Sequence, residues 1–216
     1  MPVPRDEDGY PQIQHTLSEV FIIESLNETD ERASRYEGRI LYDVLKMAEK
    51  KPKYFYFQSK EELKYLVCLF RESRYRYLHI SSHANANSIF TTNGDISYSE
   101  FAEMFSGHLI LRRLFFSACE IGNDQFINEV TQRNRGMHSI VGPENVVGMD
   151  HSVAMWTSLY ISLFAENEDR VTHARIKERI SALVTLFPMR LKIATYNPTY
   201  DTWNKEVISS ESFDPT

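Results

Sequence analysis

Short apolar runs recur along the chain, each about four residues long and each bounded by polar or glycine-containing segments. They are rich in β-branched and aromatic residues, which is typical of strands that are buried on both faces of a sheet. A sixth segment alternates apolar and polar positions, which favours an edge strand. The predicted strands are Val20–Ile23, Tyr54–Phe57, Tyr77–Ile80, Leu114–Phe116 and Ser139–Gly142, with Leu191–Tyr196 at the edge.

The segments between these runs have apolar residues at the three- and four-residue spacing of a helix face. The alternation of strand and helix predicts one α/β domain over residues 17–205, between flexible tails at 1–16 and 206–216. We expect a three-layer sandwich with about six strands in a mainly parallel sheet and helices on both faces. The predicted helices are Tyr36–Ala48, Leu63–Phe70, Phe126–Val130, Val153–Leu163 and Ile176–Phe187. Asn93-Gly94 between apolar pairs predicts a small hairpin over residues 89–96.

Charge and cysteine usage narrow the class of protein. The 24 basic residues against 30 acidic ones give a net charge of −6, which argues against nucleic-acid binding. The two cysteines, Cys68 and Cys119, do not form a disulfide pattern, and this favours a reducing compartment. With no long apolar stretch and no basic, apolar leader at the start, the expectation is a cytoplasmic protein without a membrane span.

Two predicted strands end in reactive side chains. His83 follows the third strand, and Cys119 follows the fourth. If these strands are parallel neighbours, their carboxyl ends meet at one edge of the sheet, so the thiol and the imidazole come together. A thiol beside a general base is the arrangement that nucleophilic catalysis requires. The pattern therefore predicts that Cys119 and His83 are a catalytic pair.

Small residues surround both positions, and they allow tight turns whose backbone N–H groups point outward. Ser81, Ser82 and Ala84 lie around the histidine, and Ser117, Ala118 and Gly122 lie around the cysteine. Exposed amides of this kind can stabilise an oxyanion. A helix is expected to begin near Asn123, where its positive dipole end would favour a thiolate.

The order of these segments, and Ser117-Ala118-Cys119-Glu120 with Gly122 after a buried strand, resemble the caspase-like cysteine peptidases of clan CD. Within them the chain is most similar to the CHAT subgroup, named for caspases and tetratricopeptide-repeat-linked proteins, from about Phe21 to Phe164. The resemblance implies a cysteine endopeptidase, with His83 as general base, Cys119 as nucleophile and the amides of Ala84 and Cys119 as the oxyanion hole. It implies no cofactor.

The resemblance also implies a protein or peptide substrate. In relatives that cleave after basic residues, an acidic side chain lines the substrate pocket, and Asp150 and Glu120 are the candidates here. Asp150 also has the simpler interpretation of a helix N-cap, and Glu120 that of a solvent-facing side chain. CHAT-type proteins are often regulated proteases, which implies a signalling or defence pathway and a possible regulatory protein partner.

Two other functions compete with the peptidase. A catalytically weak or inactive caspase-like scaffold that binds partners is favoured by Ala84, because the family usually has Gly directly after the histidine. A glutamine amidotransferase-like enzyme also pairs Cys with His, but its cysteine normally comes first. A metal site is not expected, because His79 and His83 on a strand lie ~13 Å apart. Cys68 is expected to pack in the core.

Overall fold

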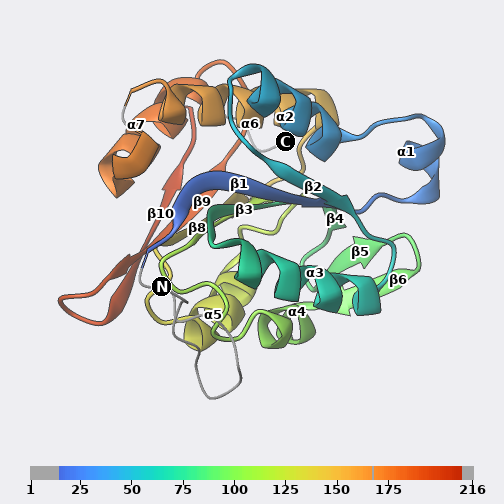
Figure 1. Cartoon of the computed structure of the whole chain (residues 1–216), viewed down its shortest axis with the longest axis horizontal. Coiled ribbons are helices and arrows are strands. Elements are labelled where there is room, and N and C mark those ends of the chain that lie inside the picture. The colour runs from blue at the N-terminus through green and yellow to red at the C-terminus, as the bar shows by residue number, and fades with distance from the viewer. Residues whose placement is uncertain (1–14, 167, 211–216) are drawn as a thin grey trace.

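The protein is described by a computed structural model over residues 15–166 and 168–210, and it has three layers (Figure 1). A seven-stranded sheet forms the middle layer of this described part, and a separate three-stranded sheet lies beside it. The strands of the large sheet are β1 (Leu17–Glu24), β2 (Lys53–Tyr56), β3 (Tyr75–Ser81), β7 (Arg113–Ser117), β8 (Ser139–Pro143), β9 (Leu191–Asn197) and β10 (Thr202–Ile208). Those of the small sheet are β4 (His83–Ala84), β5 (Ser88–Thr91) and β6 (Gly94–Ser97).

Helices cover both faces of the large sheet, as Figure 1 shows, with one group above it and another below it. The upper helices are α2 (Glu37–Met47), α6 (Met149–Phe164) and α7 (His173–Leu183). The lower helices are α3 (Lys60–Ser73), α4 (Tyr98–Met104) and α5 (Asp124–Arg133). A short helix, α1 (Glu28–Arg32), connects β1 to α2, and a 3-10 turn, η1, spans Glu168–Arg170. The predicted α/β class with helices on both faces is confirmed.

The strands of the large sheet follow the order β10-β9-β8-β7-β3-β1-β2. Five strands of this sheet, β8, β7, β3, β1 and β2, are mutually parallel, whereas β9 and β10 are antiparallel to their neighbours. Parallel pairing needs a crossover between successive strands, and the helices supply it. As predicted, the strand that ends before His83 and the strand that ends before Cys119 are direct parallel neighbours, β3 and β7.

Hydrophobic packing on the two faces explains why the strands are continuously apolar. Along β1, Phe21 and Ile23 belong to the cluster under α3, α4 and α5, whereas Val20 and Ile22 belong to the cluster under α2, α6 and α7. All four side chains are buried. Because side chains alternate between faces, a strand with helices on both sides needs an apolar residue at every position.

Several predicted elements differ from the structure. The segment Leu191–Tyr196 is not an edge strand, because β10 pairs with it on the outer side. The predicted C-terminal tail begins too early, since residues 206–208 belong to β10, while most of both predicted tails lies outside the described residues. The predicted hairpin is confirmed as β5 and β6. Among the helices of the described part, none combines the length and the apolar character that crossing a bilayer requires.

Candidate active site

The register of two neighbouring strands aligns the predicted catalytic residues. Ser81, the last residue of β3, pairs with Ser117, the last residue of β7. His83 and Cys119 each lie two residues beyond this pair, and the amide of Ser82 donates to the carbonyl of Ser117 at 3.0 Å. The two reactive side chains therefore leave the sheet at the same edge and at the same level.

A single pocket contains both side chains. It encloses about 230 Å³, and its lining combines the dyad with residues from the ends of the strands, from α2 and from α6. His83 and Cys119 are both partly exposed, so both side chains are accessible from solvent. The lining residues are Asp30, Arg35, Glu37, Ser82, His83, Ser117, Ala118, Cys119, Pro143, Val147, Met149 and Ser152.

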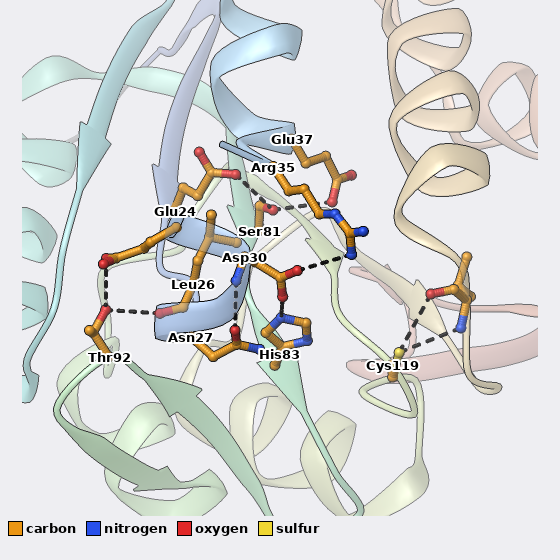
Figure 2. Close-up of polar contacts among 12 residues, drawn as sticks. Glu24, Leu26, Asn27, Asp30, Arg35, Glu37, Ser81, His83, Thr92 and Cys119 are labelled. Carbon is orange, nitrogen blue, oxygen red and sulfur yellow. Dashed lines mark hydrogen bonds and ion pairs between the residues drawn. The ribbon is translucent and has the colours of Figure 1, made fainter. Parts of the chain in front are cut away.

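The imidazole of His83 is held by a carboxylate that the sequence analysis did not identify. Nε2 of His83 lies 2.7 Å from Oδ2 of Asp30, whose side chain is only 9% exposed (Figure 2). Asp30 also pairs with the guanidinium of Arg35 at 3.3 Å. Because Asp30 engages Nε2, Nδ1 is the nitrogen that remains available to a reacting group.

Asp30 is positioned by the short helix α1. Asn27 caps this helix, since its side-chain oxygen accepts a hydrogen bond from the amide of Asp30 at 2.9 Å. Capping fixes the first turn of a helix that is too short to be stable alone. The sequence contains a signal for this turn, Asn27 followed by acidic residues, but it does not reveal which carboxylate faces the histidine.

The thiol of Cys119 lies across the site from His83 and contacts the loop before α6 (Figure 2). The amide of Val147 donates to its sulfur at 3.4 Å, and the carbonyl oxygen of Val147 lies 3.8 Å from the same sulfur. The loop therefore places an N–H donor beside the sulfur of Cys119.

The predicted oxyanion donors are the backbone amides of Ala84 and Cys119, and the hydrogen-bond pattern shows how they are engaged. The amide of Asn85 donates to the carbonyl of Ser88 at 3.0 Å, so these two form a hydrogen-bonded antiparallel pair. In an antiparallel ladder, pairs joined by backbone hydrogen bonds alternate with pairs that are not. The neighbouring pair, Ala84 and Ile89, is therefore of the second kind, and the amide of Ala84 points away from β5. Within the described residues, the amide of Cys119 has no acceptor, whereas that of Glu120 donates to Asn145.

Two buried carboxylates lie behind the dyad. Oε1 of Glu37 accepts hydrogen bonds from Ser117 at 2.7 Å and Ser152 at 3.0 Å, and Oε2 accepts one from Ser81 at 3.2 Å. The same Ser81 hydroxyl lies 3.4 Å from Oε1 of Glu24 (Figure 2). Glu37 is the first residue of α2, and it also lines the pocket.

Burial dominates the electrostatics of these carboxylates. It raises the pKa of Glu37 to about 7, and the charge of Glu24 adds to the rise, although hydrogen bonds from serine hydroxyls oppose it. Burial also raises the pKa of Glu24, against hydrogen bonds from Gly38 and Tyr54. At neutral pH, Glu37 is therefore close to half protonated.

The predicted substrate-binding residues lie outside the pocket that holds the dyad. Asp150 is exposed and lines an adjoining hollow, which shares Arg35, Glu37 and Met149 with the pocket. Gly148, and not Asp150, is the N-cap of α6. Glu120 is exposed and has a left-handed backbone, with φ of 57°. Among the residues described, no group of three or more His, Cys, Asp or Glu side chains is arranged to hold a metal ion.

Comparison with solved structures identifies the fold. A secreted C11 cysteine protease from Bacteroides thetaiotaomicron, solved in complex with an irreversible peptide inhibitor, matches 82% of this chain and 66% of its own, with a TM-score of 0.56 and 12% identity. A second structure of a secreted C11 cysteine protease from this organism, named iotapain, matches 84% of this chain and 67% of its own, with a TM-score of 0.52 and 10% identity. Caspase-1 from Spodoptera frugiperda matches 97% of this chain and 92% of its own, with a TM-score of 0.53 and 15% identity.

These similarities confirm the caspase-like α/β fold. At 10–15% identity they show the fold alone, and the CHAT subgroup stays a prediction. The chain spans 66% of the length of the inhibitor-bound C11 protease. No protein-family model and no curated protein matches the chain.

Proposed function

We propose that this protein is a cysteine endopeptidase in which Cys119 attacks a peptide carbonyl and His83 moves the proton. The observation that supports this most directly is the β3–β7 register, which brings both side chains to one pocket. The solved structures of similar fold are cysteine proteases, one of them bound to a peptide inhibitor. A shared fold does not by itself define a function, so the proposal depends on the site.

The chemistry proceeds in two stages. Nδ1 of His83 takes the thiol proton, and the sulfur of Cys119 attacks the carbonyl carbon. The amides of Ala84 and Cys119 are the proposed donors to the resulting oxyanion. The imidazolium then protonates the leaving amine, and a thioester remains on Cys119. Water, deprotonated by His83, hydrolyses the thioester and restores the thiol.

Asp30 is the positioning residue for this cycle. Its carboxylate accepts a hydrogen bond from Nε2 of His83, so the neutral imidazole presents its unprotonated Nδ1 to the thiol. When the ring gains a second proton, the adjacent negative charge stabilises the imidazolium. In this proposal Asp30, His83 and Cys119 act as a triad in which the carboxylate contacts the histidine and Arg35.

The alternative function is a scaffold without catalysis. The sequence feature that favours it is Ala84, which follows His83 where the similar family usually has Gly. Ala84 is not among the residues with positive φ, so its backbone conformation does not require glycine. The substitution therefore leaves the amide in place without strain. Regulation by a protein partner, within a signalling or defence pathway, is also part of the proposal. This part rests on the CHAT resemblance alone.

Cleavage of a mixed peptide library tests the proposal. Wild-type protein is expected to cut a subset of peptides, and Cys119→Ala is expected to cut none. Cys68→Ala is the matched control, because it removes the other thiol, on α3, and is expected to keep full activity. Equal cleavage by wild type and Cys119→Ala would show that this residue is not the nucleophile.

A further inference from the structure

We propose that the protein binds a phosphate group in a cleft at the amino ends of β7 and β8, with Arg113 as its main counter-ion. The phosphate group belongs either to a free ion or to a small organic monoester. Three features of the cleft point to this ligand: a buried cation that no carboxylate neutralises, a second cation beside it, and the exposed amides of a helix amino terminus.

The cleft lies at the opposite edge of the sheet from the dyad. Arg113 is the first residue of β7, whereas Ser117 is the last, two residues before Cys119. Four strand residues span ~13 Å, so the cleft is distinct from the pocket that holds the thiol. In Figure 1, α7 lies at the left and α1, which is next to the dyad, lies at the right. The proposed ligand therefore does not occupy the candidate active site.

Two adjoining hollows form the cleft. One encloses about 450 Å³ and the other about 850 Å³, and they share Leu111, His138 and His173. Cavities of this size commonly hold small ligands. The smaller hollow contains two arginines and three histidines, and its lining residues are His15, Thr16, Arg76, Leu111, Arg113, His138, Asp169, Val171, Thr172 and His173.

Arg113 is a buried cation whose hydrogen-bond partners are all neutral. It is 4% exposed, and its guanidinium donates to the hydroxyl of Ser139 at 2.9 Å, the carbonyl of Val171 at 2.8 Å and Nδ1 of His173 at 3.2 Å. In the part of the chain that the structure describes, its Nε has no hydrogen-bond partner and the side chain forms no ion pair. Burial lowers the pKa of Arg113 to about 10, so the group stays charged at neutral pH. A buried charge of this kind is stabilised by a bound anion.

Arg76 brings a second positive charge to the same hollow. Its guanidinium donates to the hydroxyl and the carbonyl of Thr16, and to the backbone carbonyl of Asp169. Asp169 itself is exposed, and within residues 15–166 and 168–210 its carboxylate forms no ion pair with either arginine. Two guanidinium groups with neutral partners favour a dianion, and their planar N–H groups match the oxygens of phosphate.

The first turn of α7 adds neutral donors to the cleft. Thr172 caps this 11-residue helix through the amide of Arg175, while the amides of His173 and Ala174 have no acceptor among the residues that the structure covers. His173 and Ala174 both line the larger hollow, so the positive end of the helix dipole lies at the cleft. Because a guanidinium only donates, Nδ1 of His173 accepts from Arg113, and the neutral ring carries its proton on Nε2 as a further donor.

The two histidines respond to the positive charge of the cleft. Burial lowers the pKa of His138 to about 4, and the charges of Arg113, His173 and Arg76 add to the fall. Burial and the charge of Arg113 also lower the pKa of His173 to about 4. A bound dianion would oppose this field and raise both pKa values. The other charged side chains of the cleft are exposed, as are His15 and Asp169, or paired, as are Lys177 with Glu206 at 2.7 Å and Lys205 with Asp124 at 3.4 Å.

Titration with inorganic phosphate in a chloride buffer tests the inference. Side-chain NMR is expected to show saturable shifts of the His138 and His173 resonances, and phosphate is expected to raise both pKa values by about one to three pH units. Acetate, which carries one charge and no third oxygen, is the control probe and is expected to bind about tenfold more weakly or not at all. Resonances that do not move, or acetate that binds as tightly as phosphate, would overturn the inference.

Phenyl phosphate distinguishes the two sources of the phosphate group. The organic part of a monoester would extend from the arginines into the larger hollow, beside Tyr196 and Pro198. Calorimetry compares its affinity with that of inorganic phosphate. Tighter binding of phenyl phosphate supports a monoester as the ligand, and equal or weaker binding supports the free ion.

Matched arginine variants test the cations. Arg76→Gln, at a partly buried position, is expected to weaken phosphate binding by about 10- to 100-fold, the usual effect of losing a charge-assisted hydrogen bond. Arg74→Gln removes a neighbouring charge that lines neither hollow and is expected to bind phosphate as the wild type does. Arg113→Met keeps the apolar stem and is expected to abolish binding, with circular dichroism to verify its fold. Unchanged affinity in Arg76→Gln is sufficient to refute the site, whether or not Arg113→Met folds.

The phosphate site and the proposed peptidase are tested separately. Cys119→Ala is expected to bind phosphate with the affinity of the wild type, because the thiol lies at the other edge of the sheet. Absence of phosphate binding in a protein that cleaves peptides would overturn this inference alone. Phosphate binding without peptide cleavage would support the site and remove the peptidase.

Discussion

At the scale of single residues, the Asp30–His83 contact determines what the histidine can do. A general base must present an unprotonated nitrogen to its substrate, and the partner of the other nitrogen decides which one that is. Oδ2 of Asp30 lies 2.7 Å from Nε2, and the second oxygen of the carboxylate is held by Arg35. The ring is therefore fixed in orientation and in tautomer before substrate arrives.

The Asp30→Asn variant tests this role. The substituted side chain would keep the shape of the carboxylate, but its NH₂ group can donate to Nε2 and so favour the wrong tautomer. We expect kcat to fall by ~10²–10⁴-fold with little change in KM, as for the analogous change in serine peptidases. Steady-state kinetics, with the pH profile of Cys119 alkylation, measures the effect. The exposed Asp43→Asn is the control, and an unchanged kcat and pH profile in Asp30→Asn would refute the assignment.

The sequence predicts the two reactive residues but not the two carboxylates that serve them. His83 and Cys119 each come three residues after the end of an apolar run, so the strand pattern places both at strand ends. Asp30 lies among other acidic residues in a short, polar turn, and only its three-dimensional position distinguishes it from Glu28 and Glu31. Glu37 is identified by burial, a property that the surrounding sequence does not indicate.

At the scale of elements, the turn after β7 is held against β8 by a close backbone contact. The amide of Gly122 donates to the carbonyl of Pro143 at 2.6 Å. A Cβ at Gly122 would lie 2.5 Å from the carbonyl oxygen of Gly142 and 2.8 Å from that of Pro143. Glycine is required here because two backbones approach each other directly behind Cys119.

Gly122→Ala is therefore expected to destabilise the protein by about 1–3 kcal/mol, the usual cost of overpacking, and to displace the turn that carries Cys119. Urea unfolding measures the loss, and kcat/KM is expected to fall as well. Gly148→Ala is the matched control, since its Cβ would meet the movable side chain of Asp150 and not a backbone. Equal stability of the two variants would argue against the close contact as the reason for glycine.

Element prediction succeeded where a strand is apolar along most of its length or is joined by an Asn-Gly turn, and failed for mainly polar or very short elements. The five parallel strands have apolar residues at nearly every position, so their pattern is distinctive. β10 was missed because most of its residues are polar and its burial is partial, while its pairing with β9 depends on the backbone. α4 and α1 are too short for a helical period to emerge from the sequence.

At the scale of the whole molecule, the two hydrophobic clusters stabilise the fold, whereas the buried carboxylates Glu24 and Glu37 oppose it at the edge that carries His83 and Cys119. The pKa of Glu37 is raised from 4.5 to about 7 by burial, so the folded state binds this proton more tightly than the unfolded state does. The resulting contribution to stability is complete below about pH 4.5 and is lost as pH rises through about 7. Functional sites commonly contain such unfavourable groups.

The Glu37→Gln variant measures this contribution, since Gln has no proton to lose. Relative to the wild type, its free energy of unfolding is expected to increase by roughly 2–3 kcal/mol between pH 5 and pH 8, from about 1.4 kcal/mol per unit of pKa shift. Denaturant unfolding at several pH values gives the difference directly, and titrating groups that do not interact with Glu37 cancel in it. Parallel stability profiles for the two proteins would show that Glu37 is not perturbed.

The central claim is that Cys119 and His83 act as one reactive pair, and the rate of thiol alkylation tests it most directly. Mass spectrometry after a short exposure to iodoacetamide follows Cys119 and Cys68 in the same molecule. The account predicts that Cys119 reacts at least tenfold faster than Cys68 near neutral pH, because the thiolate is the reactive form, and that His83→Ala removes the difference. Equal rates for the two thiols, or a fast Cys119 that is unaffected by loss of His83, would contradict it.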